Sequence, residues 1–81
     1  MNTAIVLLNE VSKLEEFVKI TERCPVAVYA TDSNPEDESV VNAKGMLGLL
    51  SINVKEPITV FTKKVDEDSE RYFDSIAKFI V

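Results

Sequence analysis

The scarcity of cysteine and histidine is the feature that most constrains how this chain folds. Its 81 residues include one cysteine and no histidine. A single cysteine forms no internal disulfide, and the four Cys or His ligands of a structural zinc site are lacking. The fold must therefore depend on a hydrophobic core, for which 46% apolar residues provide the material. We expect a single domain over residues 1–81, near the lower size limit for folding without cross-links.

The missing histidine and the acidic charge balance exclude several classes of function. Without histidine there is no His-based acid–base catalysis, no Ser–His or Cys–His nucleophile and no phosphohistidine. The net charge of −5 argues against nucleic acid as a partner, because phosphate backbones are bound by clustered Lys and Arg. The sequence contains no apolar run long enough for a membrane span, and Met1-Asn2-Thr3 lacks the basic start of a secretory signal. We expect a soluble intracellular protein, located in the cytoplasm.

The first part of the chain predicts a strand followed by a helix. Residues 3–8 form a short apolar run that is typical of a strand. Ser12 and Glu15 match a capping box for a helix that ends near Arg23, before Pro25. The positions spaced for one buried stripe of this helix are Val11, Leu14, Phe17, Val18 and Thr21.

The remainder of the chain predicts two strands, a helix, a strand and a final helix. Segments 26–31 and 39–43 are rich in strand-forming residues. Segment 45–51 contains two glycines and no β-branched residue, which favours a short helix. Segment 58–63 alternates apolar and polar residues as a strand does, and 66–80 begins with acidic residues that suit a helix N-terminus.

The resulting element order is β-α-β-β-α-β-α. In a chain of this length, that order resembles HPr, the small phosphocarrier of the bacterial sugar phosphotransferase system. The resemblance is sharpest over residues 39–51, which are similar to the segment around the regulatory serine of HPr. That segment consists of a short strand, a lysine, and apolar residues around a central glycine, followed by a serine. Here the corresponding residues are Lys44, Gly48 and Ser51, and residues 56–60 are similar to the strand that follows.

The resemblance implies an α+β fold, an HPr-like open-faced β-sandwich whose four-stranded antiparallel sheet carries three helices on one face. In HPr the phosphorylated histidine lies just before the first helix, where free backbone N–H groups suit a phosphoryl group. In this chain that junction is shorter and reads Asn9-Glu10, and no arginine follows it. Gly45 stands at the position of the regulatory serine. Both phosphorylation sites of the family are therefore missing.

The resemblance also implies a partner-binding surface. In HPr, exposed apolar residues of the second helix and the start of the first helix contact the partner enzymes. Leu47 and Leu50 match the exposed apolar positions, and Met46 and Ser12 complete the expected surface. By helical spacing alone, Met46, Leu49 and Leu50 share one face and Leu47 points elsewhere. Burial of Leu47 or Leu50 in the core is therefore the alternative to an exposed interface.

Several other polar or reactive positions have structural as well as functional interpretations. Glu10 is either a mimic of the phosphoryl charge or a favourable acid at the start of the helix, and we favour the second. Cys24 has the character of a buried, unreactive thiol. Asp32 and the acidic residues 36–38 are expected in a solvated turn, because they lack the spacing of a calcium-binding loop.

We therefore predict a relative of HPr that has lost the phosphocarrier chemistry and serves as a non-catalytic protein-binding or regulatory module related to the bacterial sugar phosphotransferase system. The chain is expected not to be an enzyme and to use no metal or cofactor. The expected partner is a phosphotransferase-system enzyme or a regulator that recognises HPr, and the chain is expected to be a monomer or a weak homodimer. One alternative is a true phosphocarrier that uses a carboxylate such as Glu10. The other is a self-associating structural domain whose exposed leucines form the dimer contact.

Overall fold

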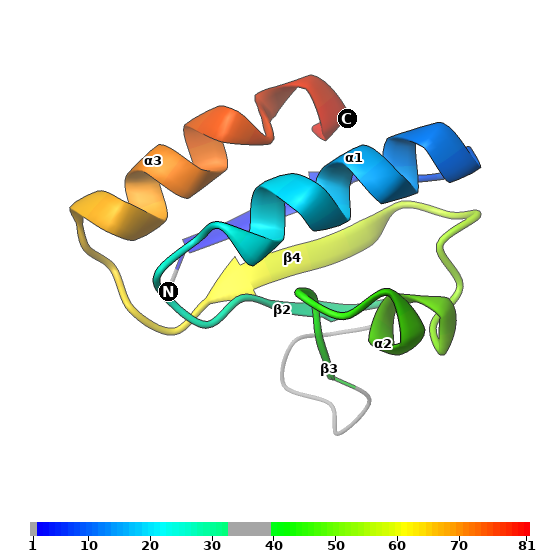
Figure 1. Ribbon diagram of the computed structural model, residues 1–81, viewed down its shortest axis with the longest axis horizontal. Helices are drawn as coiled ribbons and strands as arrows, with labels where there is room; N and C mark the ends of the chain where they lie inside the picture. The colour runs from blue at the N-terminus through cyan, green and yellow to red at the C-terminus, as the bar shows by residue number, and fades with distance from the viewer. Residues whose placement is uncertain (1, 33–39) are drawn as a thin grey trace.

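Four strands form one antiparallel sheet in the computed structural model of the protein, which describes residues 2–32 and 40–81. The strands are β1 (Asn2–Val6), β2 (Tyr29–Thr31), β3 (Val41–Asn42) and β4 (Ile58–Thr62), in the spatial order β1-β4-β2-β3. The helices are α1 (Val11–Glu22), α2 (Met46–Leu50), α3 (Glu67–Ser75) and the 3-10 helix η1 (Ala77–Phe79). The predicted α+β class and the predicted order of the elements are confirmed (Figure 1).

The strands are shorter than the sequence patterns predicted. Pairing between β1 and β4 ends at Val6, after which the Leu7 N–H donates to the carbonyl of Phe79 at 3.0 Å. Leu8 and Val28 lie outside the strands and are nevertheless fully buried. An apolar run indicates that its residues are buried, but a strand also needs a hydrogen-bonding partner for its backbone. The predicted boundaries were too wide because buried residues without such a partner were included. The predicted start of the third strand at Ser39 lies outside the described residues, as does most of the solvated turn predicted from Asp32 onward.

The helices cover one face of the sheet. Ala4, Val60 and Ala30 are aligned across three neighbouring strands and belong to this face or pack against its core. Residues from every helix share the same core cluster, among them Phe17 from α1, Leu49 from α2, Tyr72 from α3 and Phe79 from η1. The next row of the sheet points away from the helices, and there the rings of Phe61 and Tyr29 stack with centroids 5.5 Å apart.

Helix α1 buries most of the predicted stripe. Leu14, Phe17, Val18 and Thr21 are buried, as expected. Val11 is 72% exposed, so its assignment to the stripe was wrong. Val11 is the first residue of the helix and lies beyond the end of the core that the other four residues contact.

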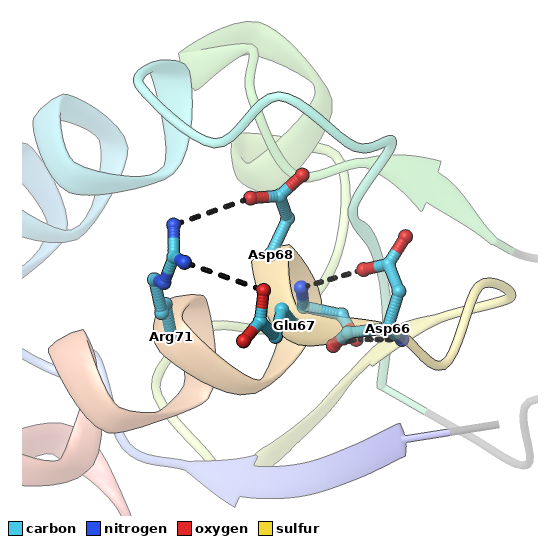
Figure 2. Close-up of polar contacts among 5 residues, drawn as sticks. Asp66, Glu67, Asp68 and Arg71 are labelled. Atoms are coloured by element: carbon cyan, nitrogen blue, oxygen red, sulfur yellow. Dashed lines mark hydrogen bonds and ion pairs between the residues drawn. The ribbon is translucent and has the colours of Figure 1, made fainter.

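Helix α3 begins with side-chain interactions that stabilise its first turn (Figure 2). Asp66 accepts a hydrogen bond from the Ser69 backbone N–H at 3.0 Å, and the Ser69 hydroxyl accepts from the Asp66 N–H at 3.1 Å. This capping box confirms the acidic helix start predicted at Asp66. Arg71 is 3.5 Å from Glu67 and 3.6 Å from Asp68, and these exposed ion pairs contribute little to stability.

The final helix is shorter than predicted, because α3 ends at Ser75 and η1 follows it. Ile76, between the two, has φ −103° and ψ 10°, which is outside the α-helical range. The change of direction buries Phe79, whose ring meets that of Phe17 edge-on at 5.8 Å. Within the described part of the chain, no helix has the length and apolar character needed to cross a membrane.

Candidate functional site

Two neighbouring leucines on α2 are prominently exposed. Leu47 is 85% exposed and Leu50 is 57% exposed, while Leu49 is fully buried and Met46 is half-buried. Residues three apart in a helix lie on the same side of it, so Leu47 and Leu50 form one patch, which we call the α2 leucine pair. The exposure expected from the family resemblance is confirmed. The grouping of Leu50 with Met46 and Leu49 was wrong, because Leu49 takes the core position and places Leu50 toward solvent.

Gly48 holds α2 close to β3 and so fixes the orientation of the leucine pair. A Cβ atom at Gly48 would lie 2.9 Å from the carbonyl oxygen of Asn42 and 3.7 Å from the Cβ of Val41. The first distance is too short for a side chain, so any larger residue would push the helix and strand apart. With Gly48 against the strand and Leu49 in the core, the opposite side of this short helix can only face outward.

The connection from β3 to α2 is fixed by Lys44 and leads to Gly45 at the N-cap of the helix. The Lys44 backbone N–H donates to Asn42 Oδ1 at 2.9 Å, and its Nζ donates to the carbonyl oxygen of Cys24 at 2.6 Å. Gly45 has an extended backbone, with φ −108° and ψ 127°. A Cβ there would be 4.0 Å from the nearest atom, the Asn42 carbonyl oxygen. The backbone would therefore accept a serine at this position, but the chain has no hydroxyl there.

The start of α1 differs from the prediction in its capping residue. Glu10, not Ser12, is the N-cap residue, and its carbonyl accepts the Leu14 N–H at 3.0 Å. The Ser12 capping box was therefore wrong: Ser12 lies within the first turn and is exposed, because the burial of Leu14 and the residues after it sets where the helix begins. Asn9 and Glu10 are both exposed, and the Glu10 side chain makes no capping hydrogen bond.

The start of α1 and helix α2 lie toward the same end of the molecule (Figure 1). This is the end of the sheet at which β1 finishes and β4 begins, as the pairing of Val6 with Ile58 shows. Within the described residues, no hydrogen bond or ion pair joins Glu10 to α2. The structure thus places the two parts of the expected surface at one end of the sheet without a direct polar link.

The remaining sequence-predicted positions have structural roles. Cys24 is buried as a free thiol, which confirms its predicted burial. Asp32 accepts a hydrogen bond from the Asn53 backbone N–H at 2.9 Å and so ties the segment after α2 to the end of β2. The acidic residues 36–38 lie outside the described residues. In the part of the chain that the structure describes, no three Cys, Asp or Glu side chains are arranged to hold a metal ion.

Sequence reasoning did not anticipate a groove of about 470 Å³ between the end of α1 and α3. Its walls include the apolar side chains of Ile20 and Pro25 and the charged side chains of Arg23 and Arg71. Tyr72 also lines it, and its hydroxyl lies 2.8 Å from Thr21 Oγ1 in a buried hydrogen bond. Burial raises the pKa of the Tyr72 phenol, and the hydrogen bond with Thr21 opposes this only in part. The pair joins α1 to α3 and acts as a structural contact.

Comparison with known proteins yields no relative: no protein-family model, no curated protein and no solved structure matches this chain. The functional argument therefore depends on the residues of the chain itself.

Proposed function

We propose that this chain is an HPr-like, non-catalytic protein-binding module related to the bacterial sugar phosphotransferase system. In this proposal the α2 leucine pair contacts a protein partner, either an enzyme of that system or a regulator that recognises HPr. The single observation that carries the proposal is the exposure of Leu47 and Leu50 on a helix whose other side is fixed to the sheet and core.

The energetics of the leucine pair support binding to a protein. Full burial of one leucine side chain stabilises a complex by roughly 1.5 to 3 kcal/mol, and two adjacent leucines provide a compact apolar anchor. The helix is positioned before any partner arrives, because Gly48 and Leu49 hold it from the other side. Binding of a partner therefore costs little conformational entropy, because this surface is already ordered.

The architecture and the altered junction support the kind of partner that we propose. The element order and the four-stranded antiparallel sheet with its helices on one face agree with what the resemblance to HPr implies. Glu10 occupies the N-cap of α1 where the family has its histidine nearby, and Gly45 occupies the position of the regulatory serine. With neither phosphorylation site present, the function that remains from that scaffold is recognition of a protein.

The test measures binding of the purified chain to enzyme I and to the HPr-reading regulator of the organism that encodes it, by isothermal titration calorimetry. We expect Leu47→Ser and Leu50→Ser each to weaken binding about tenfold, the effect of losing about 1.4 kcal/mol. Val65→Ser is the matched control. Val65 is an apolar residue about as exposed as Leu50, at 59%, but it lies between β4 and α3, away from the leucine pair. Equal weakening by all three substitutions, or binding to neither protein, would contradict the proposal.

Two further measurements separate this function from its alternatives. Incubation with phosphoenolpyruvate and enzyme I, followed by mass spectrometry, should show no phosphoryl gain. A gain that disappears in Glu10→Gln would instead establish a phosphocarrier that uses a carboxylate. Light scattering should show a monomer, and a dimer dispersed by Leu47→Glu would establish the self-associating domain.

A further inference from the structure

The outer edge of β1 is only partly covered by the rest of the chain. β1 lies at one edge of the sheet, with β4 on its inner side. On its outer side, Ile80 forms an antiparallel bridge with Val6, and the Val81 N–H donates to the Ile5 carbonyl at 3.0 Å. Residues 79–81 thus cover the edge of β1 beside residues 5–7 through this bridge and two backbone hydrogen bonds.

The unpaired backbone groups of this edge follow from the geometry of an antiparallel ladder. The N–H and C=O of one residue point to the same side, and successive residues alternate. Because Leu7 and Ile5 bond outward to residues 79 and 81, the Thr3 N–H and C=O also point outward. Among the described residues, Thr3 has no hydrogen-bond partner on that side. An open edge of this kind is a template for a further strand.

A groove of about 420 Å³ runs along this open edge, between β1 and α3. Its β1 wall includes Asn2 and Ala4, and its α3 wall includes Glu70, Phe73 and Asp74. Phe73 and Asp74 follow Glu70 by three and four positions, which places all three residues on one side of the helix. Asn2 lies at the start of α3, because its Nδ2 donates to Ser69 Oγ at 3.0 Å. Glu70 therefore belongs to the Asn2 end of the groove.

The groove combines one aromatic side chain with two acidic ones. Phe73 is half-buried, and its exposed part contributes apolar surface to the wall. Glu70 and Asp74 are exposed, and neither carboxylate has an ion-pair partner in the described part of the chain. Arg71, on the same helix, is engaged with Glu67 and Asp68. The charge of the groove is therefore negative and open to a cationic side chain.

From this arrangement we infer that the β1 edge binds an extended segment of another protein by strand addition. The segment runs antiparallel to β1, in line with residues 79–81, and its middle residue bonds to the Thr3 N–H and C=O. Opposed residues of two paired strands point to the same face, so the residue opposite Ala4 meets Phe73 and is apolar. The residue opposite Asn2 points toward Glu70 and is Lys or Arg. This second binding surface lies on a different element from the α2 leucine pair.

A second copy of this chain is a poorer occupant of the same edge. Pairing of two β1 strands would bring residues 2–6 of the partner copy, which contain no basic residue, against Glu70 and Asp74. It would also bring a second pair of the same carboxylates to the contact, and like charges there oppose association. The charge of the groove thus selects a basic segment from a different protein.

The test uses the peptide acetyl-Val-Thr-Lys-Thr-amide as the probe and the ¹⁵N-labelled full chain. In NMR titrations to about 5 mM peptide, which detect a Kd near 1 mM, we expect saturable shifts of the Thr3 and Ile5 amide signals. The control peptide is N-methylated at its first Thr, which removes the N–H that would bond to the Thr3 carbonyl. It should produce no such shifts, whereas a peptide with Glu in place of Lys should still shift these signals but bind more weakly than the Lys peptide.

Variants of the protein test the two parts of the groove separately. Thr3→Pro removes an outward N–H without disturbing the pairing with β4 and should abolish binding, whereas Thr3→Ala retains the N–H and should bind normally. Glu70→Gln with Asp74→Asn should weaken binding about two- to fourfold, with the loss diminishing at high salt. If Thr3→Pro fails to fold, the N-methylated peptide tests the same hydrogen bond on the unaltered protein.

Three outcomes would overturn the inference. The first is an absence of shifts at Thr3 and Ile5 at the highest peptide concentration. The second is equal binding of the N-methylated peptide, which would exclude strand addition. The third is a change of these signals with protein concentration alone, which would assign the edge to a second copy of this chain.

Discussion

Helices α2 and α3 are both short, and they are attached to the body of the protein by different means. Side chains hold α3: the capping box of Asp66 with Ser69 fixes its start, and Tyr72 is buried beneath it. Helix α2 has no side-chain cap, and it is held by the close approach of Gly48 to β3 and by one buried side chain, Leu49.

The outward sides of the two helices also differ, because one is charged and the other is apolar. The solvent side of α3 carries Glu67 and Arg71, which pair with each other, whereas that of α2 carries Leu47 and Leu50. A helix attached through its backbone and a single anchor leaves its other apolar residues for a partner. A helix whose outer side is charged stays in water. The comparison supports the proposal that the α2 leucine pair contacts a partner, whereas the outward Glu67 and Arg71 of α3 are satisfied by each other and by water.

The largest expected effect tests the anchor of α2. Leu49→Ala should lower the free energy of unfolding by about 3 kcal/mol, because it leaves a cavity at a fully buried position. Leu50→Ala, on the exposed side, should change it by less than about 0.5 kcal/mol. Urea denaturation measures both values. A similar loss for the two variants would show that the two sides of α2 do not differ.

The close approach of Gly48 gives the next effect. Gly48→Ala should destabilise the protein by about 1 to 2 kcal/mol, since the clash with Asn42 outweighs the better helix propensity of alanine. Gly45→Ser is the control, because a side chain fits there and serine is a good N-cap residue. Thermal unfolding should place Gly45→Ser at or slightly above the unaltered protein, and a loss there equal to that of Gly48→Ala would refute the steric argument.

The buried hydroxyl beneath α3 predicts a loss of stability in alkaline solution. Burial raises the pKa of Tyr72 in the folded protein, so the unfolded chain, with its ordinary value of about 10, releases the proton first. Stability from this group is complete below that pH and falls above it, by up to about 1.4 kcal/mol per pH unit. Urea titrations between about pH 9 and 11 should show a shallower decline for Tyr72→Phe. Identical slopes would exclude this origin.

The smallest effect compares the starts of α3 and α1. Asp66→Ala should cost about 1 kcal/mol because it removes the capping box of α3. Ser12→Ala should have almost no effect, because Ser12 is not the N-cap residue of α1. Chemical denaturation distinguishes the two, and a matching loss for Ser12→Ala would mean that Ser12 is the N-cap residue and that α1 begins two residues later than its observed start at Val11.

The elements could be predicted because each has a local signal. The spacing of Leu14, Phe17 and Val18 specifies a helix, and the β-branched and aromatic residues of Ile58–Thr62 favour a strand, whatever they pack against. Boundaries were less accurate, because the ends of β1 and β2 depend on where the neighbouring strand stops. The N-cap of α1 was misplaced for the same reason: burial of the helix against the core, not the local serine, determined its first residue.

The candidate site was only partly accessible from the sequence. Two leucines in a glycine-containing segment suggested exposure through the resemblance to HPr, while helical spacing suggested that Leu50 is buried. Which leucines are exposed depends on the close approach of Gly48 to the Asn42 carbonyl oxygen. The order of residue types along the chain does not reveal that approach. The groove beside β1 had no local signal at all, because its walls come from opposite ends of the chain.

By itself, the sequence determined that this chain has no His-based chemistry, that it folds without cross-links, and that its elements follow the order β-α-β-β-α-β-α. These properties depend on residue types and on spacing along the chain. Only the tertiary structure decided that α2 turns Leu47 and Leu50 outward and that the edge of β1 stays open beside Glu70 and Asp74. Both depend on which distant segments come together, because packing and strand pairing fill some surfaces and leave others exposed.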